Sequence, residues 1–226
     1  QKVKYMLTEI NAVKRIHYDL SSSNFYQNYA KRALDLGMVL IAAPVAVVLI
    51  GLLAVVNIAA GGSPFYAQQR VGKGGKLFQC WKLRTMVVNS DVLLKELLEK
   101  CPHSHREWAA SNKLNNDPRI TRFGQFLRKS SLDELPQLWN ILKGDMSIVG
   151  PRPVVIEELE KYGDSAQHYL SMRPGLTGIW QTNGRNTVSY DARVAMDVTY
   201  QKTVSLPLDL RIIMSTVGVV VTRTGW

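Results

Sequence analysis

The sequence has few of the residues that build disulfide frameworks or structural metal sites. Only two of its 226 residues are cysteines, Cys80 and Cys101, and they form no Cys-x-x-Cys pair. The four histidines are scattered, and the neighbouring His103 and His105 have no further metal ligands close by in the sequence. These absences disfavour a disulfide-stapled fold and a structural zinc site, so we expect a reducing, cytosolic setting with these two histidines at the surface.

Other missing features limit the architecture. The chain has no internal repeat, no low-complexity tract, no cleavable signal pattern and no initiating methionine. We therefore expect one domain of ordinary size and one anchor, within a longer protein. Negative charge is in short supply, because 18 acidic residues face 28 Lys and Arg, for a net charge of +10. This excess indicates an anionic partner, for which nucleic acid, an anionic membrane surface and phosphorylated substrates all qualify.

One long segment contains no charge at all. As a helix, Leu36 to Val56 would be about 32 Å long, enough to cross the hydrocarbon core, whereas a buried core helix of this length usually keeps a polar face. Lys31 and Arg32 precede the segment and further basic residues follow it. Because cationic flanks prefer the cytoplasm and proline breaks a helix, we expect the segment to enter the membrane, bend at Ala43-Pro44 and return to the same face.

The rest of the chain alternates strand and helix signals. Phe65–Arg70 and Leu77–Arg84 are predicted strands around a glycine-rich stretch with two lysines. This stretch could cradle a phosphate, but it lacks the Walker spacing and a following Ser or Thr, so we interpret it as a hairpin turn. Residues 89–112 have helical spacing, and residues 206–226 indicate an amphipathic helix, either on the core or in the membrane interface.

The densest polar signal is the stretch 128–138, where Asp133 and Glu134 follow two serines. Serines favour helix N-caps, and Pro136 is tolerated in an early helical turn, so we expect both carboxylates near a helix N-terminus. Backbone N–H groups there stabilise anions, including a transferring phosphoryl group. Adjacent carboxylates can hold a divalent cation, and one can attack phosphorus. The alternative is that they only complement the helix dipole.

Basic residues also recur beside glycine and proline in predicted loops. Such loops can hold an arginine in place, and the planar guanidinium suits two phosphate oxygens, so a set of them is typical of a pyrophosphate site. Each arginine taken singly could instead form a structural ion pair. The loops are Lys143-Gly144-Asp145, Gly150-Pro151-Arg152-Pro153, Met172-Arg173-Pro174-Gly175 and Asn183-Gly184-Arg185-Asn186.

In these stretches the chain resembles the bacterial sugar transferases, also called monotopic polyprenyl-phosphate phosphoglycosyl transferases. The resemblance extends over residues 31–226 nearly throughout, with the motifs in family order. The matching motifs are Lys31-Arg32-Ala33-Leu34-Asp35, Trp81-Lys82-Leu83-Arg84-Thr85-Met86, Ser131–Gln137, Lys143–Pro153 and Arg173-Pro174-Gly175-Leu176-Thr177-Gly178.

The resemblance and the segment pattern together predict an α/β fold, mostly helical with a small β-hairpin or sheet. A polar lead-in (1–30) would precede a re-entrant membrane helix (31–62) and a cytosolic transferase domain with interfacial amphipathic helices (63–226). Residues 89–112 and the tail from Tyr190 look closest to the hexose-1-phosphate enzymes that start exopolysaccharide or O-antigen units. The implied location is the cytoplasmic face of the bacterial inner membrane.

The resemblance also implies a reaction that depends on Mg²⁺. Asp133 would attack the β-phosphate of a UDP-sugar, with galactose or glucose as leading candidates, and release UMP. Undecaprenyl phosphate would then accept the sugar phosphate. Glu134 would share the metal or act as acid and base. Further site residues are expected on phosphates (Lys82, Arg128, Arg152 and Arg173) and on the nucleotide or sugar (Gln181, Asn183 and Arg185).

Two positions depart from the family pattern, with Ala43-Pro44 where Ser-Pro is common and Asn183-Gly184-Arg185 where Ser-Gly-Arg is common. The expected partners are the UDP-sugar, undecaprenyl phosphate and membrane lipids, with a second copy of the chain as a further candidate. A nucleic-acid binder would cluster its basic residues with exposed aromatics, whereas here they are dispersed among Pro/Gly loops, so we expect no nucleic acid. A noncatalytic scaffold would not need Asp133, and a conventional glycosyltransferase would release UDP.

Overall fold

The computed structural model describes residues 25–111, 114, 116–184 and 188–221. It is mostly helical with a small β-hairpin, as the sequence predicts, and it has a second two-stranded sheet that the sequence did not predict. In chain order its elements are η1 (Tyr26–Ala30), α2 (Lys31–Ala59), β1 (Phe65–Val71), η2 (Lys73–Gly75), β2 (Leu77–Leu83), α3 (Ser90–Lys100), α4 (Pro102–Ser111), α5 (Arg122–Lys129), η3 (Leu132–Glu134), α6 (Gln137–Lys143), β3 (Ser147–Val149), α7 (Ile156–Leu159), η4 (Glu160–Ser165), α8 (Ala166–Leu170), β4 (Gly175–Thr177), α9 (Ile179–Thr182), α10 (Tyr190–Thr203) and α11 (Leu206–Val221).

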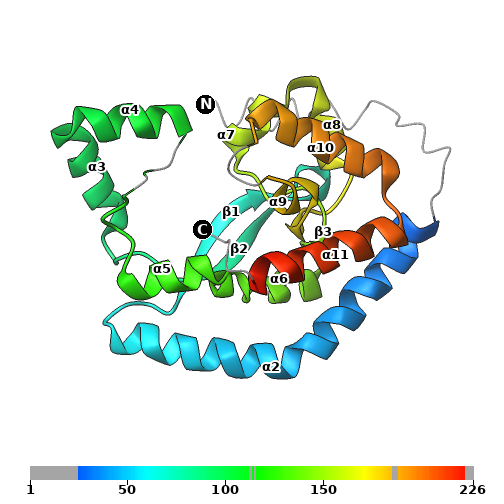
Figure 1. The fold of residues 1–226 in the computed structure, drawn as a ribbon, viewed down its shortest axis with the longest axis horizontal. Coiled ribbons are helices and arrows are strands. Elements are labelled where there is room, and N and C mark those ends of the chain that lie inside the picture. Colours follow the sequence, from blue (N-terminus) through cyan, green and yellow to red (C-terminus); the bar gives the residue numbers. More distant parts are fainter. Residues whose placement is uncertain (1–24, 112–113, 115, 185–187, 222–226) are drawn as a thin grey trace.

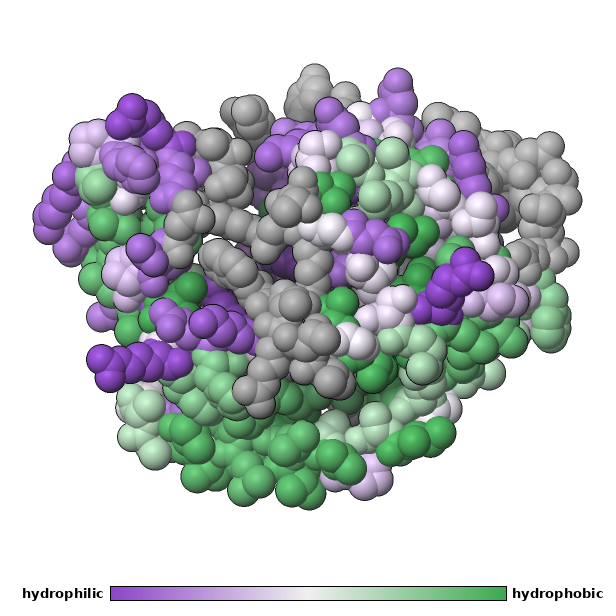
Figure 2. Space-filling model, in the orientation of Figure 1, coloured by the Kyte–Doolittle hydropathy of each residue, from purple (hydrophilic) through white to green (hydrophobic). Residues whose placement is uncertain are grey.

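Helix α2 forms the base of the molecule and is visibly bent (Figure 1). Pro44 lies inside it, and we assign the bend to this proline because it removes a backbone donor and crowds the preceding turn. Many of its apolar side chains face outward, with Ile41 82% and Leu40 65% exposed. Figure 2 shows the resulting hydrophobic surface along the base. A core helix would bury these side chains, and α2 is long and apolar enough to cross a membrane, so it has the character of a membrane-associated helix.

The predicted hairpin is confirmed. Strands β1 and β2 pair antiparallel, with Phe65 opposite Leu83 and Val71 opposite Leu77. The glycine-rich stretch between them makes a single 3-10 turn, in which Gly74 (φ 67°) takes the left-handed conformation that glycine adopts at little cost. The turn interpretation therefore holds, and it places Lys73 at the hairpin tip.

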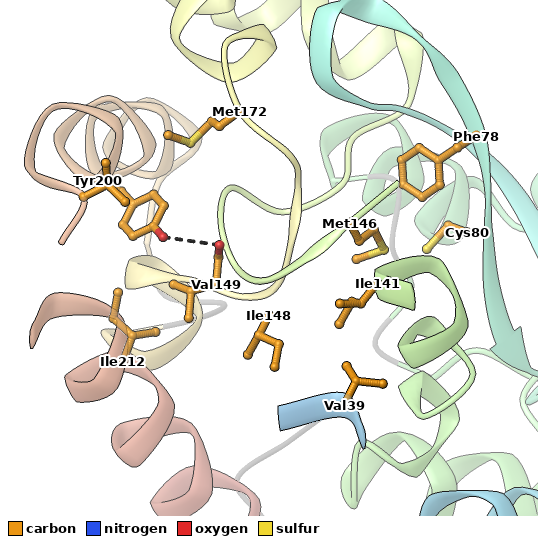
Figure 3. Packing of buried hydrophobic residues seen from close by; sticks show 11 residues of the cluster. Val39, Phe78, Cys80, Ile141, Met146, Ile148, Val149, Met172, Tyr200 and Ile212 are labelled. Carbon is orange, nitrogen blue, oxygen red and sulfur yellow. Dashed lines mark hydrogen bonds between the residues drawn. The ribbon is translucent and has the colours of Figure 1, made fainter. Parts of the chain in front are cut away.

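The main hydrophobic core joins α2 to the rest of the domain. Figure 3 shows Val39 of α2 pointing toward Ile141 of α6 and Ile148 of β3, all of them buried. Asp35, one turn earlier on α2, is buried and accepts hydrogen bonds from the Ser147 hydroxyl (3.0 Å) and the Ile148 amide (2.9 Å). The first limb of α2 is thus fixed to the domain by apolar packing and by a satisfied buried carboxylate.

Backbone contact between two loops defines the second sheet. Strands β3 and β4 pair in parallel, and the Gly175 amide donates to Pro151 O at 2.8 Å. A Cβ placed on Gly150 would lie only 2.6 Å from Arg173 O, so glycine is required by this close approach. The packing brings the Gly150–Pro153 loop against the loop that precedes β4.

Two further helical predictions are met with differences. The described part of the predicted stretch 89–112, which ends at residue 111, forms two helices, α3 and α4, because Pro102 cannot continue α3. No side chain of α3 is buried. Figure 1 shows α3 and α4 projecting from the body as an arm. The predicted C-terminal helix is α11, which exposes Met214 and Val217 and buries Ile212. The predicted lead-in up to residue 24 lies outside the described residues.

Candidate active site

The two adjacent carboxylates lie in a short 3-10 turn, η3, that leads into α6. The serines before them do not cap this turn as the sequence suggested. The Ser130 hydroxyl donates to Phe126 O at 2.8 Å and so completes the end of α5, while Ser131 adopts a left-handed conformation (φ 56°) that reverses the chain. The reversal brings Asp133, which is 8% exposed, beneath the hairpin.

Lys82 of β2 joins the two carboxylates. Its Nζ lies 2.6 Å from Glu134 Oε1 and 3.9 Å from Asp133 Oδ2. Gln137, at the start of α6 and almost fully buried, is hydrogen bonded to the Glu134 side chain. Glu134 is therefore held by two neighbours, while Asp133 keeps a looser contact with the ammonium. The arrangement leaves Asp133 the less restrained of the two carboxylates.

The environment separates the pKa values of the two acids. Burial raises the pKa of Asp133 to about 6, a shift that Lys82 and Arg128 oppose and the Glu134 charge reinforces. Burial also disfavours ionised Glu134, but Lys82 and then Arg152 outweigh it and hold the Glu134 pKa below its usual range. Unequal pKa values in adjacent carboxyl groups are typical of sites where they have different roles. At neutral pH both are ionised, and Asp133 is the more basic.

A cavity open to solvent lies beside Glu134 and Lys82, and Asp133 is not among its lining residues. Arg70, Lys82 and Arg152 line it together with Glu134, so its walls carry an excess of positive charge. Arg70 is fixed by hydrogen bonds to Pro153 O (3.0 Å) and Gln68 Oε1 (2.6 Å). The Arg152 guanidinium lies 6.0 Å from the centre of the Trp180 ring. Cations held in place around a small cavity suit a multiply charged anion such as a pyrophosphate.

Most of the predicted site residues gather here. Lys82, Glu134, Arg152 and Gln181 line the cavity. Arg128 is adjacent, since its charge acts on Asp133 and its Nε donates to Thr85 Oγ1 at 2.9 Å.

Two predicted residues lie elsewhere, and a third is outside the described residues. Arg173 donates to Gly144 O at 2.9 Å and lines a separate cavity. Asn183 is exposed at the end of α9 and is not among the lining residues of the active-site cavity. Arg185 lies outside the described residues.

Sequence reasoning did not single out Arg70 or Gln137. Gln137 closes the Ser131–Gln137 motif, and its polar side chain just after Pro136 is a signal that could have identified it. Arg70 gave no such signal, because it reaches the site only through the pairing of β1 with β2.

The carboxylate pair fits Mg²⁺, which typically takes one or two carboxylates and completes its shell with water and substrate phosphates. Asp133 and Glu134 would supply hard oxygen ligands to such an ion. In the described part of the chain no group of three or more His, Cys, Asp or Glu side chains comes together, so a fully protein-built metal cage is not present there. The residues present suit a metal shared with a phosphorylated substrate.

These features describe a membrane-associated domain in which two adjacent carboxylates and several cations come together beside one cavity. The model of the bacterial sugar transferase family matches residues 26–223, and the chain belongs to that family.

Several relatives carry descriptive names. The chain is 55% identical over 165 residues to "Undecaprenyl-phosphate galactose phosphotransferase" of Salmonella typhimurium, an alignment that covers 73% of this chain and 35% of that protein. It is 40% identical over 169 residues to "UDP-glucose:undecaprenyl-phosphate glucose-1-phosphate transferase" of Xanthomonas campestris pv. campestris, covering 71% and 32%. It is 48% identical over 201 residues to "Exopolysaccharide production protein ExoY" of Rhizobium meliloti, covering 87% of each. The chain thus spans about a third of the first two relatives.

Proposed function

We propose that this protein is a phosphoglycosyl transferase that moves hexose 1-phosphate from a UDP-sugar to undecaprenyl phosphate and releases UMP. Galactose and glucose are the leading sugars, since both occur in the names of relatives. The reaction would be the first membrane step of exopolysaccharide, capsule or O-antigen synthesis. The single observation that carries the proposal is the Asp133–Glu134 pair, which Lys82 bridges: Asp133 is buried, and Glu134 lines a cationic cavity.

The reaction we propose has two displacements at one phosphorus atom. In the first, an Asp133 carboxylate oxygen forms a bond to the β-phosphorus, and the bond from that phosphorus to the bridging oxygen breaks. The bonding pair leaves with UMP, and the sugar phosphate stays on Asp133 as an acyl phosphate. In the second, a phosphate oxygen of the lipid attacks the same phosphorus and the Asp133 carboxylate departs.

The surrounding residues have distinct parts in this scheme. Lys82 and Arg152 hold phosphate oxygens and balance the charge that moves to the leaving group. Arg128 lies on the Asp133 side and favours its ionised form. Glu134, kept ionised by Lys82 and Arg152, offers an oxygen to the metal. A bound Mg²⁺ would supply further neutralisation of the pyrophosphate.

The same inference includes location and topology. The domain would lie on the cytoplasmic face of the inner membrane, where UDP-sugars are made, with α2 as a re-entrant anchor. The exposed apolar side chains of α2 and of α11 support contact with lipid along one side of the molecule.

Rapid quench with purified protein, Mg²⁺ and a UDP-sugar in the absence of lipid tests the covalent step. We expect a burst of one UMP per active site and a protein mass increased by one hexose phosphate, with the adduct mapped to Asp133. If UMP forms only after lipid phosphate is added and no adduct is trapped at early times, direct displacement replaces the covalent scheme. Release of UDP instead of UMP would contradict phosphoglycosyl transfer altogether.

A further inference from the structure

A second cavity, also open to solvent, lies where the start of α2 meets the hairpin tip and the loop before β4. It shares no lining residue with the active-site cavity. Its walls include four cations, Lys31, Arg32, Lys73 and Arg173, and one carboxylate, Asp35. These residues come from three distant parts of the sequence. The fold therefore brings the charges together, and they do not belong to one basic stretch of the chain.

The charges in this cavity are not balanced. Asp209 lies behind the wall and forms an ion pair with Lys31 at 2.6 Å. The Asp35 carboxylate already accepts hydrogen bonds from the Ser147 hydroxyl and the Ile148 amide of β3. Four cations against these two carboxylates leave two positive charges in excess. Neither Lys73 nor Arg173 forms an ion pair with any residue that the structure describes.

The two arginines are held in place by the end of α6. Arg32 donates from Nη1 to Ile141 O (2.6 Å) and from Nη2 to Leu142 O (3.0 Å). Arg173 donates from Nε to Gly144 O at 2.9 Å. A guanidinium has five N–H donors, so this bond leaves most of the Arg173 fork for another acceptor. Because backbone carbonyls already orient both guanidinium groups, a bound anion would not have to immobilise them, and that entropic cost of binding would be small.

Lys73 completes the set from the opposite side. It lies in the 3-10 turn at the hairpin tip, and within the described residues no hydrogen bond of its ammonium is recorded. Partial burial, and then the neighbouring charge of Arg173, lower the pKa of Lys73. Two like charges facing one cavity repel each other, and a bound anion would remove that repulsion.

We propose that this cavity binds a phosphate group, separately from the active site. Lys31 and Arg32 begin the helix whose exposed apolar face follows, so the cavity lies at the polar end of the anchor, within reach of lipid headgroups. The phosphate can thus come from an anionic phospholipid or from a soluble phosphate. The inference rests on the cavity alone and does not depend on the proposed reaction.

Lysine footprinting on the full chain in neutral detergent distinguishes the two sources. Lysines are acetylated briefly, and the extents at Lys73 and Lys76 are compared by mass spectrometry, since Lys76 lies in the same turn but does not line the cavity. The probes are dihexanoyl phosphatidylglycerol, dihexanoyl phosphatidylcholine and inorganic phosphate, each below any micelle-forming concentration. Labelling of Lys82 reports separately on phosphate in the active-site cavity.

We expect phosphatidylglycerol to slow labelling of Lys73 several-fold relative to Lys76, and phosphatidylcholine to have no such effect. If inorganic phosphate protects Lys73 equally well, the site takes soluble phosphate. If only phosphatidylglycerol protects it, the site is one for a lipid headgroup. Equal protection of the two lysines, or no protection by either anion, would overturn the proposal.

Matched variants supply an independent measurement. Lys73→Gln and Lys76→Gln remove the same charge from the same turn, and melting curves establish that each variant is folded. We expect Lys73→Gln to raise the Kd of the protecting probe at least about fivefold and Lys76→Gln to change it less than about twofold. Equal losses would mean that only the net charge of the turn matters, and an unchanged Kd in folded Lys73→Gln would exclude the site.

Discussion

Asp133 combines burial with two nearby cations, which makes its carboxylate both ionised at neutral pH and more basic than a surface aspartate. Asp133→Asn keeps the shape of the side chain but removes the attacking charge. We predict that sugar-phosphate transfer falls by at least roughly 10³-fold, as when a covalent nucleophile is lost. Asp91→Asn, at an exposed position on α3, is the matched control and should retain activity. Full activity in purified Asp133→Asn would remove Asp133 from the mechanism.

The raised pKa of Asp133 also predicts a pH dependence. Only the ionised carboxylate attacks, so the first half-reaction should speed up as the pH rises through about 6 and level off above it. Between about pH 5 and pH 7.5 we expect roughly a tenfold increase in the rate of the UMP burst. Measurement of the burst without lipid isolates this step. A rate that is flat over this range would mean that the nucleophile titrates elsewhere.

Whether the sequence could predict the position of a site residue depended on how far apart in the sequence its contacts lie. The motif around Asp133 and Glu134 was informative because both carboxylates and their turn lie within one short stretch. The position of Arg173 was not predictable, because it depends on a hydrogen bond from its guanidinium to the carbonyl of Gly144, far away in the sequence. This bond places Arg173 at a different cavity. Arg70 illustrates the same point, since only the strand register brings it beside Lys82.

Helix α10 contacts η4 through a buried carboxyl group. Asp197, only 4% exposed, accepts a hydrogen bond from the Tyr162 hydroxyl at 2.7 Å, and burial raises its pKa from 3.8 to about 7. The folded chain therefore binds this proton more tightly than the unfolded chain. The stabilisation is complete below about pH 4 and is lost as the pH rises toward 7, with an upper limit of about 4 kcal/mol.

Asp197→Asn should remove this dependence. The amide keeps an oxygen for Tyr162 but does not ionise, so we predict a higher melting temperature than wild type above about pH 7 and a flatter profile from pH 4 to 7. Thermal melts at several pH values in the same detergent measure both effects. Asp164→Asn, at an exposed position in the adjacent η4, should follow the wild-type profile. Parallel profiles for wild type and Asp197→Asn would contradict the assignment.

Element boundaries were predictable where local chemistry decides them. The hairpin follows from two strand-like runs around glycines, and the long uncharged run gave α2. The second sheet was not foreseen, because its three-residue strands form by pairing between segments far apart in the sequence, Ser147 with Gly175 and Val149 with Thr177. Likewise, the sequence predicted that Ser130 would cap the turn that follows it, whereas its hydroxyl donates a hydrogen bond to Phe126 O at the end of α5.

At the scale of the whole molecule, the proposed re-entrant topology puts both ends of α2 on the cytoplasmic side. Cys101 provides a native reporter after the anchor, and Ser21→Cys adds one before it, while Cys80 is buried. We predict that a membrane-impermeant maleimide labels both reporters in inverted vesicles and neither in intact spheroplasts. Labelling of Ser21→Cys from the periplasm alone would mean that α2 crosses the membrane.

Replacement of the helix-bending proline tests the cause of that topology. Pro44→Leu restores the backbone donor and removes the clash with the preceding turn, so α2 should straighten. We expect the Ser21→Cys reporter to become accessible from the periplasm in part of the molecules while Cys101 stays cytoplasmic. Pro118→Leu, in a turn outside α2, is the control and should leave labelling unchanged. Unaltered labelling in Pro44→Leu would assign the bend to packing rather than to proline.

The close approach of Gly150 and Gly175 affects how the chain can vary over evolutionary time. Backbone hydrogen bonds and close backbone packing join the loop of Arg152 to the loop of Arg173, and these contacts do not depend on which side chains line the two cavities. Mutations in the walls can therefore change the preferred anion while both sites keep their alignment. An added methyl group at either glycine would instead collide with the facing backbone. One nucleotide change per codon separates glycine from alanine, and at these two positions that change would displace both cavities at once.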